Sequence, residues 1–397
     1  MGQRKFQCIS FNKGVIPGGR SGETQKGAPT PSIGFVSYPR EVPTIPARIA
    51  NKTASRKSAV TANAPAQGEL SLIRQIRQRA PSFSRSEVRL GIGDDCALLR
   101  PRRGEEFAVT TDLSIAGRHF WLAIHPPESI GHRAIVRGLS DLAAMGARPV
   151  AALVSLAVPR KLAGVWTSRF YDGLLALANA HKTALAGGDL SESPIPLADI
   201  VLVGSVPAGK ALLRSGARPG EVVYVTGTLG GSAAGLARLA EMGEPPAGSA
   251  KRRRIPRATS ISGGDERLAL HLYPQPRIAQ GLWLRRRGIA SAAIDLSDGL
   301  SIDITHLCEE SGVAAEIDAA LLPIHPAATL EQALHGGEDY ELLFTAPASA
   351  RVPKAIAGVP VTRIGRILKR GGKRASVTLN RAEGARPLHP AGWQHFA

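Results

Sequence analysis

The 397-residue sequence has only three cysteines, few aromatic residues and no long apolar run. Cys8, Cys96 and Cys308 are widely separated and form no CxxC pair, which excludes a disulfide framework and a cysteine-built zinc site. No apolar stretch approaches the roughly 20 residues of a transmembrane helix, and the N-terminus lacks the apolar core of a secretory signal. We therefore expect a cytoplasmic protein with no membrane partner.

Acidic residues are also scarce: 32 Asp and Glu stand against 50 Lys and Arg, for a formal net charge of +18. Such an excess raises nucleic-acid binding as an alternative function. However, residues 1–66 contain ten basic and two acidic side chains and are rich in Gly, Pro, Ser and Thr. This composition predicts a disordered leader, which fits an organelle transit peptide or an over-extended start equally well. The leader holds a large share of the net charge and is assigned no function.

A second basic cluster, at residues 251–257, lies in a stretch rich in Gly, Pro and Ser. No aromatic residue interleaves its charges, and aromatic residues make up only 5% of the chain. A surface that stacks nucleotide bases needs such residues. We therefore interpret the cluster as a solvated insertion rather than a phosphate- or RNA-binding loop, and expect no nucleic-acid partner.

The remaining chain alternates between helical and strand-like patterns twice, which predicts an α/β (α+β) protein of two domains, residues 67–206 and 207–397. Neither half has GxGxxG after a strand or GxxxxGK[ST], so Rossmann and Walker-type nucleotide sites are unsupported. The first half contains a predicted helix after Gly68 and the elements 107–112, 128–147, 150–158, 166–181, 183–186 and 199–206. The second half contains the predicted elements 221–226, 230–241, 278–286, 292–296, 300–311, 314–317, 342–346 and 361–367.

Acidic residues beside glycine, serine or threonine recur at the ends of predicted elements. Taken singly, each is typical of a helix cap or a turn. Together, with few histidines and no paired cysteines, they predict oxygen ligands for Mg²⁺ or a similar cation, while the glycines allow close approach to a phosphate. Six such sites occur, at residues 91–95, 110–112, 139–141, 187–189, 294–299 and 336–341.

Asp141 lies inside the predicted helix 128–147, among apolar residues. A partly buried aspartate costs free energy unless it is paired or bound to a metal. This position therefore favours a functional role over a structural one.

Seven segments together resemble thiamine-monophosphate kinases of the PurM-like ATP-binding superfamily, and they follow the family's order between residues 69 and 396. They are GIGDDCALL (91–99), TTDLSIAGRHF (110–120), LSDLAAMGARP (139–149), LAGGD (185–189), KALLRSGARPGEVVYVTG (210–227), AIDLSDGLSID (293–303) and GGEDYELLFT (336–345). The resemblance implies a two-domain PurM-like fold. An N-terminal mixed-sheet domain for dimerisation and ATP binding would precede a C-terminal α/β sandwich-like domain.

The resemblance also implies an activity: ATP-dependent phosphorylation of thiamine monophosphate to thiamine diphosphate, the last step of thiamine diphosphate synthesis. The implied partners are thiamine monophosphate, ATP and several Mg²⁺ ions, in a homodimer. The acceptor is a phosphate oxygen that is already anionic near neutral pH. Catalysis then requires alignment and charge neutralisation, with neither a phospho-enzyme nor a strong general base.

Site residues follow motif by motif from the resemblance. The implied metal ligands are Asp95, Thr110, Thr111, Asp112, Asp141, Asp189, Asp295 and Asp298, of which Asp112, Asp141 and Asp298 would assist catalysis through the metal. The implied ATP contacts are Gly188, Asp189, Arg214 and Ser297. The implied substrate contacts are His119, Glu338 and Trp393. The Trp393 ring could face the cationic thiazolium, although packing of a terminal residue on the core explains it equally well.

Two departures from the family's pattern stand out. Residues 190–193 are Leu-Ser-Glu-Ser where the family usually has Thr-Thr-Arg-Gly, and Gly138 replaces a frequent Asn. The alternatives are another enzyme of the superfamily (aminoimidazole ribonucleotide synthetase, selenophosphate synthetase or a hydrogenase-maturation dehydratase) or a binding module that has lost activity. The full set of motifs favours the thiamine enzyme.

Overall fold

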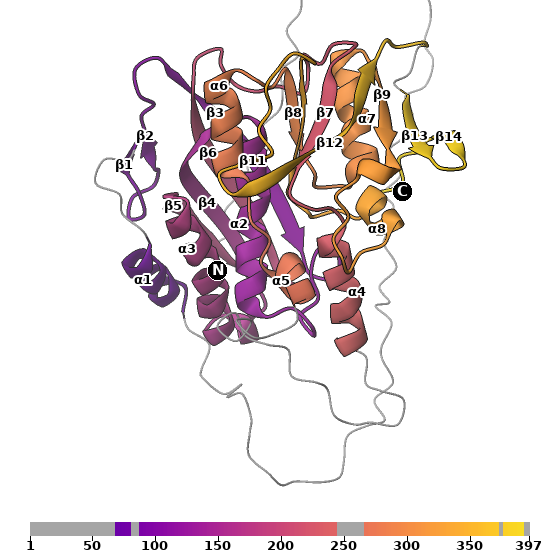
Figure 1. Ribbon diagram of the computed structural model, residues 1–397. Coiled ribbons are helices and arrows are strands. Elements are labelled where there is room, and N and C mark those ends of the chain that lie inside the picture. The colour runs from indigo at the N-terminus through magenta and orange to yellow at the C-terminus, as the bar shows by residue number, and fades with distance from the viewer. Residues whose placement is uncertain (1–67, 81–86, 244–265, 373–375, 393–397) are drawn as a thin grey trace, which may run out of the picture. The chain divides into compact units, whose positions relative to one another are not determined.

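Two large β-sheets with their helices, together with a separate two-stranded ladder, make up the described part of the computed structural model (Figure 1). The structure describes residues 68–80, 87–243, 266–372 and 376–392, which belong to one compact unit. The segments 1–66 and 251–257 and the side chain of Trp393 lie outside the described residues.

The first sheet is a mixed four-stranded sheet in the order β3-β6-β4-β5. Strands β4 and β5 run parallel, whereas β6 is antiparallel to both of its neighbours. Its strands are β3 (Glu105–Ile115), β4 (Arg148–Val158), β5 (Ala184–Glu192) and β6 (Leu197–Pro207). The same half of the chain contains α1 (Glu69–Arg79), α2 (Pro127–Ala144), η1 (Arg160–Leu162), α3 (Val165–Ala180) and a two-stranded ladder of β1 (Val88–Leu90) and β2 (Leu98–Leu99).

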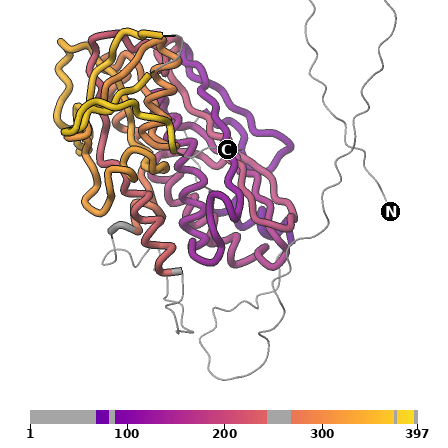
Figure 2. Tube along the Cα trace, turned by 90° about the vertical axis from the view of Figure 1, so that its right-hand side faces the viewer, coloured from indigo at the N-terminus to yellow at the C-terminus, as the bar shows by residue number. Residues whose placement is uncertain are grey.

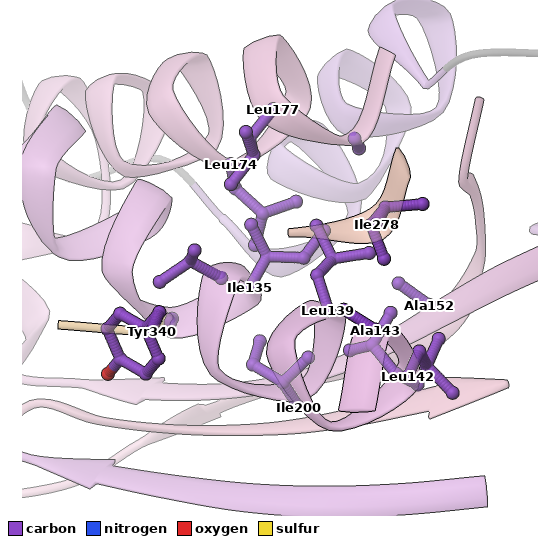
Figure 3. Close-up of a cluster of buried hydrophobic side chains, with 14 of the residues drawn as sticks. Ile135, Leu139, Leu142, Ala143, Ala152, Leu174, Leu177, Ile200, Ile278 and Tyr340 are labelled. Atoms are coloured by element: carbon purple, nitrogen blue, oxygen red, sulfur yellow. The ribbon is translucent and has the colours of Figure 1, made fainter. Parts of the chain in front are cut away.

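Helix α2 is the centre of the larger core because it contacts α3, the first sheet and elements of the second half. Ile135 and Leu139 of α2 pack with Leu174 and Leu177 of α3 and with Ile200 of β6 (Figure 3). Apolar residues at steps of three and four place these side chains on one face, and burying each stabilises the fold by roughly 1.5–3 kcal/mol. The polar residues of α2 are thereby held on a rigid helix.

The second sheet follows the order β14-β13-β9-β12-β7-β10-β8, with β11 paired to β12. The β13–β9 pair is parallel and the other pairs are antiparallel. Figure 2 shows most of this half in orange and yellow, with its first elements in rose. Its strands are β7 (Val222–Thr226), β8 (Ala292–Asp295), β9 (Ala314–Asp318), β10 (Leu342–Ala346), β11 (Ala355–Ile356), β12 (Val359–Leu368), β13 (Val377–Arg381) and β14 (Gly384–Pro387). Its helices are α4 (Gly231–Gly243), α5 (Glu266–Leu272), α6 (Ile278–Arg287), α7 (Leu300–Ser311), η3 (Ala319–Leu321) and α8 (Leu330–His335).

The elements that periodicity did not predict are short: β1, β2, η1, α5, η3, α8, β11, β13 and β14. Helix α2 also ends before the predicted Ala147, because the chain turns at Gly146, which has a left-handed φ of 62°. In the described part of the chain, no helix has the length and apolar character needed to cross a bilayer.

Candidate active site

Four aspartates from both halves of the chain line one cavity of about 540 Å³. Asp112 comes from β3 and Asp141 from α2, whereas Asp295 ends β8 and Asp298 follows in the next loop. The site therefore depends on the packing of α2 against β8.

Hydroxyl groups fix two of these carboxylates. Thr110 Oγ1 donates to Asp141 Oδ2 at 2.5 Å, and Ser140 Oγ donates to Asp295 Oδ2 at 2.7 Å. The second bond joins α2 to β8 directly. Because successive residues of a strand face opposite ways, Thr111 instead donates to Asp199 at 2.8 Å, away from Asp141.

Asp303, on the first turn of α7, holds the loop after β8. One oxygen, Oδ2, accepts the backbone N–H groups of Ser297, Asp298 and Gly299 at 3.1, 3.2 and 3.0 Å. Burial raises the pKa of Asp303 to about 8, and the neighbouring charges of Asp295 and Asp298 add to this effect. Asp303 thus positions Ser297 and Asp298 at the cavity without lining it.

The loop before β10 closes another wall of the cavity. Glu338 and Tyr340 both have left-handed φ values, 65° and 52°, which are costly for residues other than glycine. The backbone N–H of Glu338 donates to Ser297 O at 2.8 Å, and that of Tyr340 donates to Leu296 O at 2.9 Å. A Cβ at Gly337 would lie 2.5 Å from Ser297 O, so this close approach requires glycine.

Glu338 is held by Arg133, a residue that sequence reasoning missed. Arg133 Nη2 lies 2.6 and 2.7 Å from the two carboxylate oxygens of Glu338, and Nη1 contacts the ring and backbone of His271. The Arg133 side chain is only 8% exposed. The sequence did contain a signal, since Arg133, Arg137 and Asp141 recur every four residues and therefore share one face of α2.

Arg137 also lines the cavity, and its Nε lies 3.4 Å from Asp112 Oδ1. Burial raises the pKa of Asp112 to about 6; Arg137 opposes this shift and Asp141 adds to it. Burial likewise raises the pKa of Asp295 to about 7, and the charge of Asp141 adds to it. The cluster therefore concentrates more negative charge than the free protein readily accommodates.

This donor set fits a hard divalent cation. Among the described residues, no three His, Cys, Asp or Glu side chains are already arranged to hold a metal ion. Mg²⁺ commonly uses one or two carboxylates together with substrate phosphates and water, rather than a cage made only of protein. Asp112, Asp141, Asp295 and Asp298 could each supply such a ligand.

A second group of predicted residues lies elsewhere, around a wider cavity of about 960 Å³ lined by Asp95, Gly188 and Asp189. Gly188 has a φ of 145°, and a Cβ there would lie 1.9 Å from Val154 O, so only glycine fits. Asp95 and Asp189 are both exposed. The structure therefore does not bring these two aspartates into the first cavity.

The remaining predicted residues divide between the first cavity and its surroundings. His119 lines the cavity, and its Nδ1 accepts the backbone N–H of Ile115 at 3.1 Å. Ser297 lines it as well. Arg214 is exposed, but its charge acts on Asp141 and Asp295.

Comparison with known proteins gives two family matches in sequence order. Residues 93–206 match the model of the AIR synthase related protein N-terminal domain, and residues 218–378 match that of the C-terminal domain. Thiamine-monophosphate kinase from Escherichia coli K12 is 42% identical over 312 residues, covering 76% of this chain and 90% of that protein. The chain belongs to the thiamine-monophosphate kinase family. The predicted family and the two-domain PurM-like fold are thus confirmed.

Solved structures agree with this assignment. The crystal structure of thiamine-monophosphate kinase from Stenotrophomonas maltophilia K279a is 38% identical, with a TM-score of 0.65, and the match covers 78% of this chain and 96% of that one. The structure of AaThiL complexed with AMPPCP and TMP is 33% identical, with a TM-score of 0.62, and the match covers 83% of this chain and 97% of that one.

Proposed function

We propose that the first cavity transfers the γ-phosphoryl group of ATP directly and in line to the phosphate of thiamine monophosphate. The chain is a thiamine-phosphate kinase, and its products are thiamine diphosphate and ADP. The observation that supports the location is the convergence of four aspartates from both halves of the chain on one cavity.

The chemistry requires little from the protein beyond position and charge. The bond between the γ-phosphorus and the bridging β–γ oxygen of ATP breaks while an acceptor phosphate oxygen bonds to the same phosphorus. Because that oxygen is already anionic, no side chain needs to remove a proton. Bound Mg²⁺ would supply the positive charge that offsets both polyanions, and Asp112, Asp141, Asp295 and Asp298 would hold it.

The walls of the cavity suggest an orientation for the substrates. Glu338 and His119 lie together beside Arg133, and a carboxylate there suits the cationic thiazolium of thiamine. Ser297 and Arg214 lie on the side of Asp295 and would contact the nucleotide. Gly188 and Asp189 remain proposed ATP contacts at the second cavity, and Trp393 remains a proposed thiamine contact.

We also propose a homodimer that pairs through the first sheet. Helices α2 and α3 pack on one face of this sheet, whereas the other face exposes apolar side chains. Val109 is 64% exposed and Leu113 is 46% exposed on β3. Such apolar side chains on an open sheet face are suited to pairing with a second copy.

A cytoplasmic location is likewise a proposal. It is supported by the state of the described cysteines, since Cys96 and Cys308 are both free thiols. Burial raises the pKa of Cys308 to about 12, which keeps this thiol protonated and unreactive.

The test supplies purified protein with Mg-ATP and either thiamine monophosphate or thiamine, and quantifies thiamine diphosphate and ADP. We expect equal amounts of both products with thiamine monophosphate, none with thiamine, and none when EDTA removes the metal. Turnover of a different phosphate or amide substrate, with no thiamine diphosphate, would reject the function and favour another enzyme of the superfamily.

A further inference from the structure

Three arginines line the first cavity, and their guanidinium groups differ in burial and in the side chains they already contact. Arg133 is saturated by Glu338 and His271. Arg118 is exposed, so solvent screens its charge. Arg137 is largely enclosed, with 21% of its side chain exposed, and the one ion pair that it forms with a described residue is the 3.4 Å contact from Nε to Asp112.

The outer part of the Arg137 guanidinium is therefore available. Among the described residues, Asp112 is the one side chain that pairs with this guanidinium. A buried guanidinium donates up to five hydrogen bonds, and its planar fork matches two oxygens of a phosphate. The available donors point to an anionic ligand that the protein itself does not supply.

Arg137 shares the cavity with both groups of acidic residues. The charges of Asp112 and Asp298 act on it, and so does that of Glu338. Together with His119, Arg133 and Glu338 it lines a small recess that adjoins the same cavity. An acceptor that places its thiazolium near Glu338 and its reacting oxygen near the aspartates has its own phosphate beside Arg137.

We infer that Arg137 binds the phosphate of thiamine monophosphate and so selects phosphorylated thiamine over thiamine itself. This inference rests on the proposed function, because it takes the acceptor from it. A charge-assisted pair with phosphate outweighs the single long contact with Asp112. A purely structural role, in which Arg137 only offsets the charge of Asp112, would affect both thiamine ligands equally.

The test measures equilibrium binding of thiamine monophosphate and of thiamine by calorimetry, with Mg²⁺ and AMPPCP present so that no phosphoryl group is transferred. The variants are Arg137→Gln, Arg137→Lys and the matched control Arg286→Gln, which removes the same charge from an exposed position on α6. Binding of AMPPCP alone is measured for each variant.

We expect Arg137→Gln to raise the Kd of thiamine monophosphate about tenfold or more, a loss of about 1.4 kcal/mol, and to leave the Kd of thiamine within twofold. Arg137→Lys should recover part of the loss, and Arg286→Gln should change neither ligand. Equal losses for both thiamine ligands, no loss for either, or a loss confined to AMPPCP would overturn the inference. The activity assay on the wild-type protein tests the proposed function separately: if it yields no thiamine diphosphate, the proposed function fails. The binding measurements on the variants test only the role of Arg137.

Discussion

The two cavities contain the same kinds of residue but differ in how the fold treats them. In the first, Asp112, Asp141 and Asp295 lie close together, hydroxyl groups hold Asp141 and Asp295, Arg137 contacts Asp112, and burial raises the pKa values of all three aspartates. Around the second, Asp95 and Asp189 are exposed on a wider opening. The comparison shows that the two kinds of evidence answer different questions. Aspartates beside glycines in the sequence indicate that the protein binds phosphate groups. Burial of several aspartates together indicates where bound cations must neutralise negative charge during the reaction.

The largest expected effect comes from Asp112→Asn in the first cavity. Losing one carboxylate weakens binding of the Mg²⁺ that would neutralise negative charge in the transition state. We therefore expect kcat to fall by about 10³-fold or more. The measurement is steady-state production of thiamine diphosphate at saturating Mg-ATP. The metal-free protein should unfold at the same or a higher temperature, since the substitution removes a repelled charge. The control is Asp172→Asn on α3, outside both cavities.

Asp189→Asn provides the contrast at the second cavity. This side chain is exposed, so its removal should act on nucleotide binding, raising the KM for ATP about tenfold with little change in kcat. A loss of kcat as large as that of Asp112→Asn would mean that the two cavities act as one site, and would break the comparison.

A smaller effect is expected on stability against pH. The pKa of Asp295 is about 7 in the folded protein, so the folded state keeps a proton that the unfolded chain, with a pKa near 3.8, has already lost. The protonated Asp295 therefore adds to the free energy of unfolding at low pH, and this contribution is lost as the pH rises from about 4 to 7. The melting temperature of metal-free protein should fall by on the order of 5 °C across this range relative to Asp295→Asn.

Thermal unfolding in EDTA at pH 5, 6, 7 and 8 checks this expectation. Asparagine can still accept the hydrogen bond from Ser140, so the variant removes the titration and keeps the contact. Mg²⁺ should stabilise the wild-type protein increasingly as the pH rises, because the ligands must lose their protons to bind it. Parallel curves for the two proteins would contradict the assigned burial of Asp295.

Much of this site could be predicted from the sequence, for identifiable reasons. Asp141 stood out because a carboxylate inside an apolar helix is costly, and its place in the first cavity agrees with that argument. The separation of Asp189 from Asp141 could not be predicted, since Asp189 lies inside β5, which continues to Glu192, and its distance from α2 depends on how the strand and the helix pack. Arg133 was missed because its partner Glu338 lies 205 residues away and no local pattern joins them. The short strands β13 and β14 were missed because their pairing with β9 and with each other is not visible in their own sequence.

The most direct test of the central claim is the stereochemical course of the reaction at phosphorus. ATP made chiral at the γ-phosphorus with oxygen isotopes is converted with thiamine monophosphate, and the configuration of the transferred group in thiamine diphosphate is determined. Direct in-line transfer in the first cavity predicts inversion of configuration. Retention would require two displacements through a phosphorylated residue and would contradict the account.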